Sequence, residues 1–119
     1  MLKDYYGKDA SALLLKKLYL FDMDGTIYLG NRLFGGVKEL LEKIASAGSA
    51  YVFITNNASK SVADYVKKLH GMGLENVTED NFFTSAQAAV LLMKERHGAD
   101  LIFVQGTRSF VEECRQSGL

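Results

Sequence analysis

Apolar positions along the chain fall into two patterns. Uninterrupted apolar runs at 18–21, 51–54 and 101–104 have the length of strands buried on both faces of a sheet. Between and after them, apolar residues recur at helical spacing over 37–44, 62–69, 86–93 and 110–114. Residues 82–83 form a short extended piece at most. Strands that alternate with helices predict an α/β fold with a parallel sheet and right-handed crossovers.

Glycines and capping residues mark the helix ends, because the chain contains no proline. Gly48 follows the first predicted helix, and Gly71 and Gly73 follow the second. The second helix starts at Ser59 or Ser61. Pairs that fit a capping box open three helices: Ser61 with Asp64, Thr84 with Gln87, and Ser109 with Glu112.

Two further segments have a local signature. Gly30 and Asn31 separate the apolar runs 27–29 and 32–34, which predicts a tight two-residue hairpin. It would stand as a flap over the residues before it, or be a plain surface hairpin. Residues 1–17 form an N-terminal extension, either with a short helix over 12–16 capped by Asp9 or Ser11, or as a disordered lead-in.

Composition narrows the class of protein. The 119 residues suffice for one domain, and 14 basic residues balance 14 acidic ones. A net charge of zero gives no support for binding nucleic acid or a membrane surface. Cys114 is the single cysteine, and no apolar run approaches the length of a membrane span. We therefore expect a soluble, cytoplasmic domain.

The candidate chemistry lies where the first two strands end. Asp22 and Asp24 follow the run 18–21, Gly25 permits a sharp turn after them, and Thr55 follows the run 51–54. The carboxyl ends of parallel strands share a crevice, so these side chains should converge. Two close carboxylates repel each other unless a cation lies between them. One can attack phosphorus and the other can exchange a proton, while Thr55 and the next helix donate to phosphate oxygens.

These residues resemble a known family. Phe-Asp-Met-Asp-Gly-Thr at 21–26 resembles the first signature of the haloacid dehalogenase (HAD) superfamily, and Thr-Asn-Asn at 55–57 resembles the second. The closer pattern is similar to the NagD-like and p-nitrophenylphosphatase-like subfamily, class IIA. The resemblance covers residues 18–119. It implies a three-layer, Rossmann-like parallel sheet with a flap hairpin.

The resemblance also implies roles for the residues. Asp22 would be the nucleophile that becomes an aspartyl phosphate, and Asp24 the general acid and base. Both would bind Mg²⁺, Asp24 through its backbone carbonyl. The phosphate-binding residues would be Thr55, Asn56, Asn57, Gly25 and Thr26. The function implied is magnesium-dependent hydrolysis of a small phosphorylated metabolite.

Two motifs of the family pattern are missing from the chain. The family's third motif supplies a lysine and its fourth supplies further acids, and neither is found here. We expect residues 18–119 to be the N-terminal part of a core whose cap and C-terminal strands are absent. The isolated chain should then be weakly active or inactive. Strand 18–21 would have an open edge, through which the chain could self-associate.

Other readings remain open. A non-catalytic HAD-like core could bind phosphate or a protein partner. A receiver-type signalling domain has a similar length, but the run 101–104 ends in Gln-Gly-Thr without the required acid. A dinucleotide-binding module would need Gly-x-Gly-x-x-Gly after the first strand, which this sequence lacks. Sugar phosphates, nucleotides and phosphoglycolate all remain possible substrates.

Overall fold

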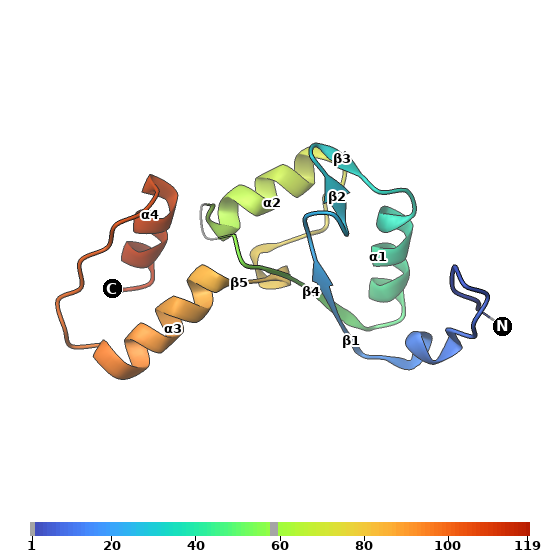
Figure 1. Cartoon of the computed structure of the whole chain (residues 1–119), viewed down its shortest axis with the longest axis horizontal. Helices are drawn as coiled ribbons and strands as arrows, with labels where there is room; N and C mark the ends of the chain where they lie inside the picture. Colours follow the sequence, from blue (N-terminus) through green and yellow to red (C-terminus); the bar gives the residue numbers. More distant parts are fainter. Residues whose placement is uncertain (1, 58–59) are drawn as a thin grey trace.

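A computed structural model describes residues 2–57 and 60–119 (Figure 1). Its elements, in chain order, are the 3₁₀-helix η1 (Ser11–Leu15), β1 (Leu18–Asp22), β2 (Tyr28–Leu29), β3 (Arg32–Leu33), α1 (Val37–Ser46), β4 (Ala50–Thr55), α2 (Val62–Gly71), the 3₁₀-helix η2 (Glu79–Asn81), β5 (Phe82–Thr84), α3 (Ser85–His97) and α4 (Arg108–Gln116). The predicted hairpin is confirmed as β2 and β3, joined by Gly30 and Asn31.

The main sheet is parallel and has the strand order β1-β4-β5. The pairing of β1 with β4 runs from Leu18 opposite Ala50 to Asp22 opposite Ile54. The piece at 82–83 extends to Thr84 and pairs with β4 as the third strand. The α/β class and the parallel sheet predicted from the sequence are therefore confirmed.

The two faces of this sheet differ in chemistry. One face is aromatic, and α1 and α2 pack against it to form the core (Figure 1). Phe53 is fully buried at its centre, with its ring 5.3 Å from Phe82 and 5.5 Å from Tyr51. Aromatic rings bury large areas and pack favourably at these distances, so this face supplies much of the stability.

The opposite face is mainly aliphatic and largely uncovered. Leu18 and Leu20 of β1 are 55% and 60% exposed, and Ile54 and Phe83 are also exposed. The prediction that 18–21 is buried on both faces is therefore wrong for this chain. The reason is that α1 and α2 both lie on the aromatic face, and β1 makes its main contacts with β4 alone in the described residues.

The run 101–104 is not a strand, which corrects the second prediction from apolar content. Leu101 is fully exposed and Phe103 is 89% exposed, whereas Ile102 and Val104 are half-buried. The segment links α3 to α4, and Ile102 and Val104 line a hollow that also involves Cys114. An apolar run forms a strand only where a neighbouring strand offers backbone partners, and none of the described strands does so here.

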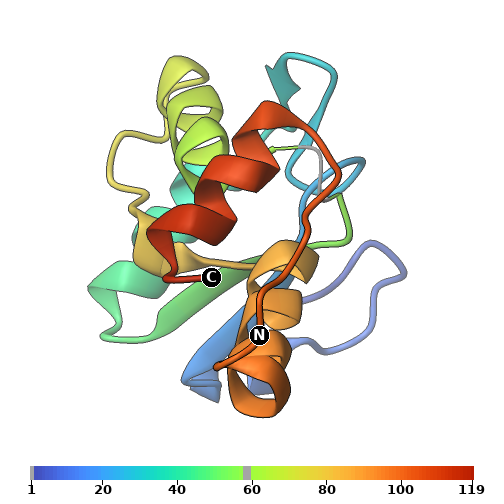
Figure 2. The ribbon, with the colours of Figure 1, turned by 90° about the vertical axis from the view of Figure 1, so that its left-hand side faces the viewer.

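Helix caps are mostly those expected. Capping boxes are confirmed at the starts of α2 and α3, formed by Ser61 with Asp64 and by Thr84 with Gln87. Ser59, the alternative start of α2, lies outside the described residues. The predicted cap of α4 is wrong: Thr107, not Ser109, accepts from the Phe110 N–H at 3.2 Å. The Ser109 hydroxyl instead donates to Asp64 Oδ2 at 2.6 Å and so joins α4 to α2 (Figure 2).

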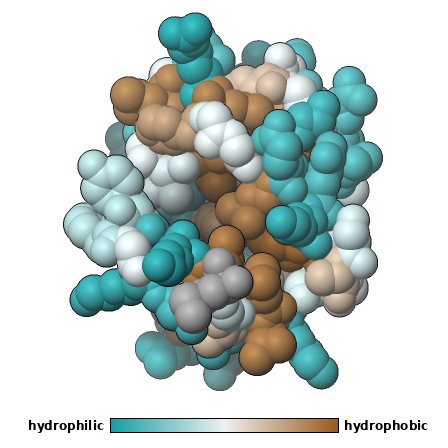
Figure 3. Space-filling model, turned by 90° about the vertical axis from the view of Figure 1, so that its right-hand side faces the viewer, coloured by the Kyte–Doolittle hydropathy of each residue, from teal (hydrophilic) through white to brown (hydrophobic). Residues whose placement is uncertain are grey.

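The two ends of the chain lengthen the molecule. Its radius of gyration is 16.9 Å, against about 13.5 Å for a compact chain of this length. At the N-terminal end, η1 begins after Ala10, which makes no side-chain cap. The Asp9 carboxylate accepts from the N–H of Ser11, the first residue of η1, at 2.9 Å, so of the two predicted caps Asp9 makes a bond to the helix start. Apolar side chains gather around a hollow on the side that carries this terminus (Figure 3). No helix in the described chain is long and apolar enough to cross a membrane.

Candidate active site

Asp22 is the last residue of β1, and its side chain lines an open hollow of about 270 Å³ at the carboxyl ends of the strands. Thr55, the last residue of β4, and Asn56 line the same hollow, together with Ile54, Phe83, Thr84 and Ser85. The structure thus brings Asp22, Thr55 and Asn56 together. Asp24, Gly25, Thr26 and Asn57 lie in the adjoining loops and do not line the hollow.

The loop after β1 is held by its own backbone. Gly25 has φ +82°, which glycine adopts without the steric cost that other residues incur, and its N–H donates to the Tyr28 carbonyl at 2.8 Å. The Met23 carbonyl accepts from the N–H groups of Thr26 and Ile27 at 3.0 and 2.8 Å. Met23 and Ile27 are almost fully buried, which anchors the loop to the core. Asp24 therefore lies on an ordered turn.

Thr26 and two tyrosines surround the acids. The Thr26 hydroxyl donates to Asp22 Oδ2 at 3.3 Å, which restricts the rotation of that carboxylate. Burial raises the pKa of Tyr28, and the neighbouring Tyr65, Asp24 and Asp22 raise it further. Burial likewise raises the pKa of Tyr65, a hydrogen bond with the Thr55 side chain lowers it in part, and Asp24 adds a smaller increase. Both phenols are thereby kept neutral beside the acids.

The Thr-Asn-Asn segment is tied to the helices that follow it. The Thr55 hydroxyl accepts from the Asn57 N–H at 3.1 Å. The Asn57 carbonyl accepts from the Tyr65 hydroxyl of α2 at 3.3 Å, and the Asn56 carbonyl accepts from the Ser85 hydroxyl of α3 at 3.1 Å. These bonds fix the loop relative to both helices, so Thr55 is presented by a preorganised segment.

Sequence reasoning missed Thr84 and Ser85 as lining residues. Thr84 ends β5, and its side chain is engaged in capping α3. Ser85 is the first residue of α3, and it lines the hollow while its hydroxyl donates to the Asn56 carbonyl. The signal was present, because Thr84 and Ser85 follow an apolar pair as Thr55 follows β4. The apolar pair at 82–83 was too short to predict a strand of the sheet, so the two polar residues after it were not predicted to line the site.

The oxygen donors near Asp22 fit a magnesium ion in part. Carboxylate and carbonyl oxygens are its preferred protein ligands, and it commonly retains several waters. Asp22 offers a carboxylate and Asp24 a carbonyl on the ordered loop. Within residues 2–57 and 60–119, no group of three or more His, Cys, Asp or Glu side chains is placed to hold a metal. The described chain thus contributes only some of the ligands that such an ion needs.

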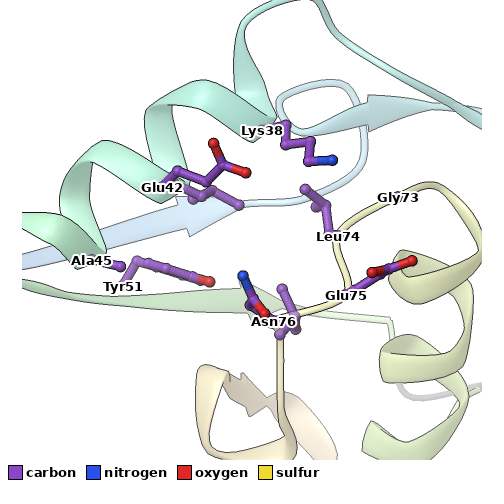
Figure 4. A pocket seen from close by; sticks show the side chains of 10 residues that line it. Lys38, Glu42, Ala45, Tyr51, Gly73, Leu74, Glu75 and Asn76 are labelled. Carbon is purple, nitrogen blue, oxygen red and sulfur yellow. The ribbon is translucent and has the colours of Figure 1, made fainter.

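A second cavity does not compete with this site. It lies between α1 and the loop 73–77, and Lys38, Glu42, Tyr51 and Glu75 are among its lining residues (Figure 4). Its volume is about 50 Å³, against about 270 Å³ for the hollow at Asp22. It has room for water but not for a phosphate ester.

Comparison with known proteins identifies the family. The model of the haloacid dehalogenase-like hydrolases matches residues 19–119. The chain belongs to this family. The segment that matches begins at β1 and includes both loops that line the hollow, so the match covers the whole site.

Relatives of known name agree with this assignment. Phosphoglycolate phosphatase 2 of Arabidopsis thaliana is 35% identical over 102 residues, which are 84% of this chain and 34% of that protein. The sugar-phosphatase AraL of Bacillus subtilis is 33% identical over 100 residues, 84% of this chain and 36% of that protein. The chain thus spans about a third of the length of these two curated relatives.

Solved structures place the chain in the NagD-like and p-nitrophenylphosphatase-like subfamily. A 4-nitrophenylphosphatase from Thermotoga maritima has a TM-score of 0.82 and 37% identity, over 89% of this chain and 40% of that one. NagD from E. coli has a TM-score of 0.75 and 26% identity, over 86% and 40%. A glycerol phosphate phosphatase from Mycobacterium tuberculosis, in complex with magnesium, has a TM-score of 0.70 and 28% identity, over 85% and 30%. The subfamily predicted from the sequence is confirmed.

Proposed function

We propose that this chain carries the nucleophile and the first phosphate-binding loop of a magnesium-dependent phosphomonoesterase. The observation that supports this most directly is the shared hollow, where the Asp22 carboxylate and Thr55 lie at the ends of adjacent parallel strands. Four of the five relatives described above are named phosphatases, and one of the four was solved in complex with magnesium. We assign residues 18–119 to this catalytic core and residues 1–17 to an extension.

In the proposed reaction, one Asp22 oxygen attacks the phosphorus of the monoester. The new aspartyl O–P bond forms as the P–O bond to the alcohol breaks, and Asp24 gives the leaving oxygen a proton. Water then attacks the same phosphorus. Asp24 takes a proton from that water, the aspartyl O–P bond breaks, and inorganic phosphate leaves with the Asp22 carboxylate restored.

The loops around the hollow would bind the phosphoryl group. Thr55 would bind its oxygens through the hydroxyl, and Asn56 and Asn57 through the same loop. Gly25 and Thr26 would shape the turn that presents Asp22, consistent with the Thr26 hydroxyl bond to that carboxylate. The backbone N–H groups in the first turn of α3, which begins at Ser85 directly after β5, would add further donors.

Asp22, through its carboxylate, and Asp24, through its carbonyl, would hold the magnesium ion. Such an ion neutralises charge that develops on the transferring phosphoryl oxygens. Among the described residues, the lining of the hollow includes no lysine or arginine. Electrostatic stabilisation supplies most of the catalysis in phosphoryl transfer, so we expect this chain alone to turn over slowly or not at all.

The substrate class that we propose is a small phosphorylated metabolite. The names of the relatives include phosphoglycolate, sugar and glycerol phosphate phosphatases, which differ in the organic part but share the phosphomonoester. The hollow is open, and its lining residues are Asp22, Ile54, Thr55, Asn56, Phe83, Thr84 and Ser85. It therefore fits the shared phosphoryl group better than any one organic part.

Beryllofluoride trapping tests the nucleophile without requiring turnover. The chain is titrated with beryllofluoride in the presence and absence of Mg²⁺ and followed by ¹⁹F NMR. We expect a protein-bound beryllofluoride signal that requires Mg²⁺ and is lost in Asp22→Asn. Asp80→Asn is the matched control, since Asp80 is exposed and lies outside the hollow. A signal that persists in Asp22→Asn, or none in the folded wild-type chain, would support a non-catalytic core instead.

A further inference from the structure

Tyr65 is a buried tyrosine of α2 whose hydroxyl reaches the loop after β4. The residue is only 2% exposed, and its ring stacks on that of Phe82 with 6.0 Å between the centroids. Its hydroxyl donates to the Asn57 carbonyl at 3.3 Å. A buried phenol needs a hydrogen-bond partner for its hydroxyl. Here that partner belongs to the segment that we propose binds phosphate.

Three hydrogen bonds join Tyr65, Thr55 and Asn57 in a closed ring. The Asn57 N–H donates to the Thr55 hydroxyl oxygen at 3.1 Å, and the Tyr65 hydroxyl donates to the Asn57 carbonyl. Burial raises the pKa of Tyr65, and a hydrogen bond with the Thr55 side chain lowers it in part. A hydrogen bond lowers the pKa of a phenol when it is donated to the oxygen, because it then stabilises the phenolate. Thr55 is therefore the donor to Tyr65, and each residue of the ring donates once and accepts once.

This ring directs the proton of the Thr55 hydroxyl toward Tyr65. A hydroxyl has only one proton to donate. Thr55 also lines the hollow beside Asp22, so a phosphoryl oxygen bound there would accept the same proton. The Thr55 hydroxyl must then turn from Tyr65 to the ligand. Its oxygen need not move, because the Asn57 N–H still donates to it and Tyr65 still donates to the Asn57 carbonyl.

The same face of α2 also holds the loop after β1. Lys68 follows Tyr65 by three residues, so the two side chains lie on one face of the helix. The Lys68 Nζ lies 4.1 Å from the centroid of the Tyr28 ring, which is within the range of a cation–π interaction. Tyr28 is 4% exposed, and its carbonyl accepts from the Gly25 N–H at 2.8 Å. One face of α2 therefore sets the position of both loops.

We propose that Tyr65 is a positioning residue, which holds Thr55 and Asn57 in the free chain and lets the Thr55 hydroxyl turn to a phosphoryl oxygen as that group binds. The identity of the ligand rests on the proposed function, whereas the ring of hydrogen bonds does not. Binding is favoured because the Thr55 oxygen is already in place and only its proton changes direction, so little conformational entropy is lost. Without the Tyr65 hydroxyl, the Thr55 side chain and the Asn57 carbonyl each lose this partner.

NMR of ¹³C-labelled tyrosine Cζ atoms tests the ring in the free chain, because this resonance responds to hydrogen bonds at the attached hydroxyl. Tyr51 is the matched control, since it is buried in the same core and lines the small cavity beside α1 instead of the hollow. Thr55→Val keeps the branched shape of the side chain and removes its hydroxyl. We expect this variant to shift the Tyr65 resonance and to leave that of Tyr51 in place. An unchanged Tyr65 resonance in the folded variant would overturn the ring and the proposal with it.

Beryllofluoride with Mg²⁺ tests the turn of the Thr55 hydroxyl. As it binds to the wild type, the Tyr65 resonance should move toward its position in Thr55→Val, because both changes remove the proton donated to the phenol. Tyr65→Phe should weaken beryllofluoride binding by about three- to tenfold, the value of one neutral hydrogen bond, and Tyr51→Phe should not. Circular dichroism under the same conditions confirms that both variants are folded. A Tyr65 resonance that binding leaves in place, or equal affinities for the two variants, contradicts the positioning role.

The two kinds of failure are distinguishable. A folded wild-type chain that gives no bound beryllofluoride signal contradicts the proposed function, and the effect of Thr55→Val on the Tyr65 resonance still decides whether the ring exists. A bound signal that depends on Asp22 but leaves Tyr65 unaffected contradicts the positioning role alone.

Discussion

Gly25 offers the clearest test of how the loop after β1 is built. Its φ of +82° lies in the left-handed region, and a Cβ added there would meet no atom within 4 Å. Gly25→Ala therefore perturbs the backbone alone, without a clash. Gly35 is the matched control, because a Cβ there also meets nothing within 4 Å and its φ lies outside the left-handed range.

The magnitude follows from the difference between the two variants. Replacing glycine by alanine lowers the entropy of the unfolded chain, which stabilises a protein by about 0.4–1 kcal/mol where the native conformation allows it. This gain is common to both sites. Holding a non-glycine residue in the left-handed region costs roughly 1–2 kcal/mol. Gly25→Ala should therefore have a free energy of unfolding about 1–2 kcal/mol lower than Gly35→Ala.

Urea denaturation followed by circular dichroism measures both free energies under one condition. Beryllofluoride binding by the same proteins adds a reading of the site, which should weaken in Gly25→Ala because the turn holds Asp22 and Asp24 in position. Gly35→Ala should bind as the wild type does. Equal free energies of unfolding for the two variants would refute the assignment of strain to Gly25 and, with it, the ordered turn.

Two further predictions concern the core and the α2–α4 contact. Phe53→Leu should lower the free energy of unfolding by about 1–2 kcal/mol through lost ring contacts. Phe103 is 89% exposed, so Phe103→Leu should change that free energy by less than about 0.5 kcal/mol. Equal losses in the two variants would contradict the aromatic core. Hydrogen bonds from the Ser109 hydroxyl and, to a smaller extent, from the Ser61 N–H lower the pKa of Asp64. The ionised Asp64 side chain therefore adds to the free energy of unfolding above the pKa of the unfolded chain, and this stabilisation is lost as the pH falls below about 4. Thermal melts from pH 7 to pH 3 should show a steeper acid loss for wild type than for Asp64→Asn, and parallel curves would contradict this.

The sequence predicted strands well where neighbours existed to pair with them. The runs 18–21 and 51–54 are both strands, extended by one or two residues, because each finds the other as a partner. The run 101–104 has the same apolar content but no partner strand in the described chain. Its apolar residues divide instead between solvent and the hollow beside Cys114. Apolar content thus indicates which segments can be strands, and tertiary pairing decides which are.

The local pattern of capping residues predicted two helix caps correctly and a third wrongly. The Ser61 and Thr84 caps could be predicted because each needs only residues within its own first turn. Ser109 has the same local signature, yet its hydroxyl donates to Asp64, 45 residues earlier in the chain. Thr107 caps the helix in its place. A competing acceptor that reaches Ser109 only in the folded chain is invisible to a local pattern.

The grouping of Asp22 with Thr55 was predictable because the ends of parallel strands meet at one edge. Asn56 follows from the same rule, and so would Ser85 once 82–84 is included in the sheet. The rule could not show that Asp24 and Asn57 lie beside the hollow rather than in its lining. That depends on the direction of each turn, which Gly25 and the bonds around Asn57 determine.

The open edge and the candidate nucleophile belong to one set of positions. Leu18, Leu20 and Asp22 alternate along β1, so they share both a side-chain face and an outward-facing backbone. The alternation that directs the Asp22 carboxylate into the hollow therefore also leaves its backbone groups facing outward at the open edge. Any strand that completes this edge will place its own side chains next to Asp22. Closing this edge of the sheet and adding side chains beside the hollow would therefore be a single structural event.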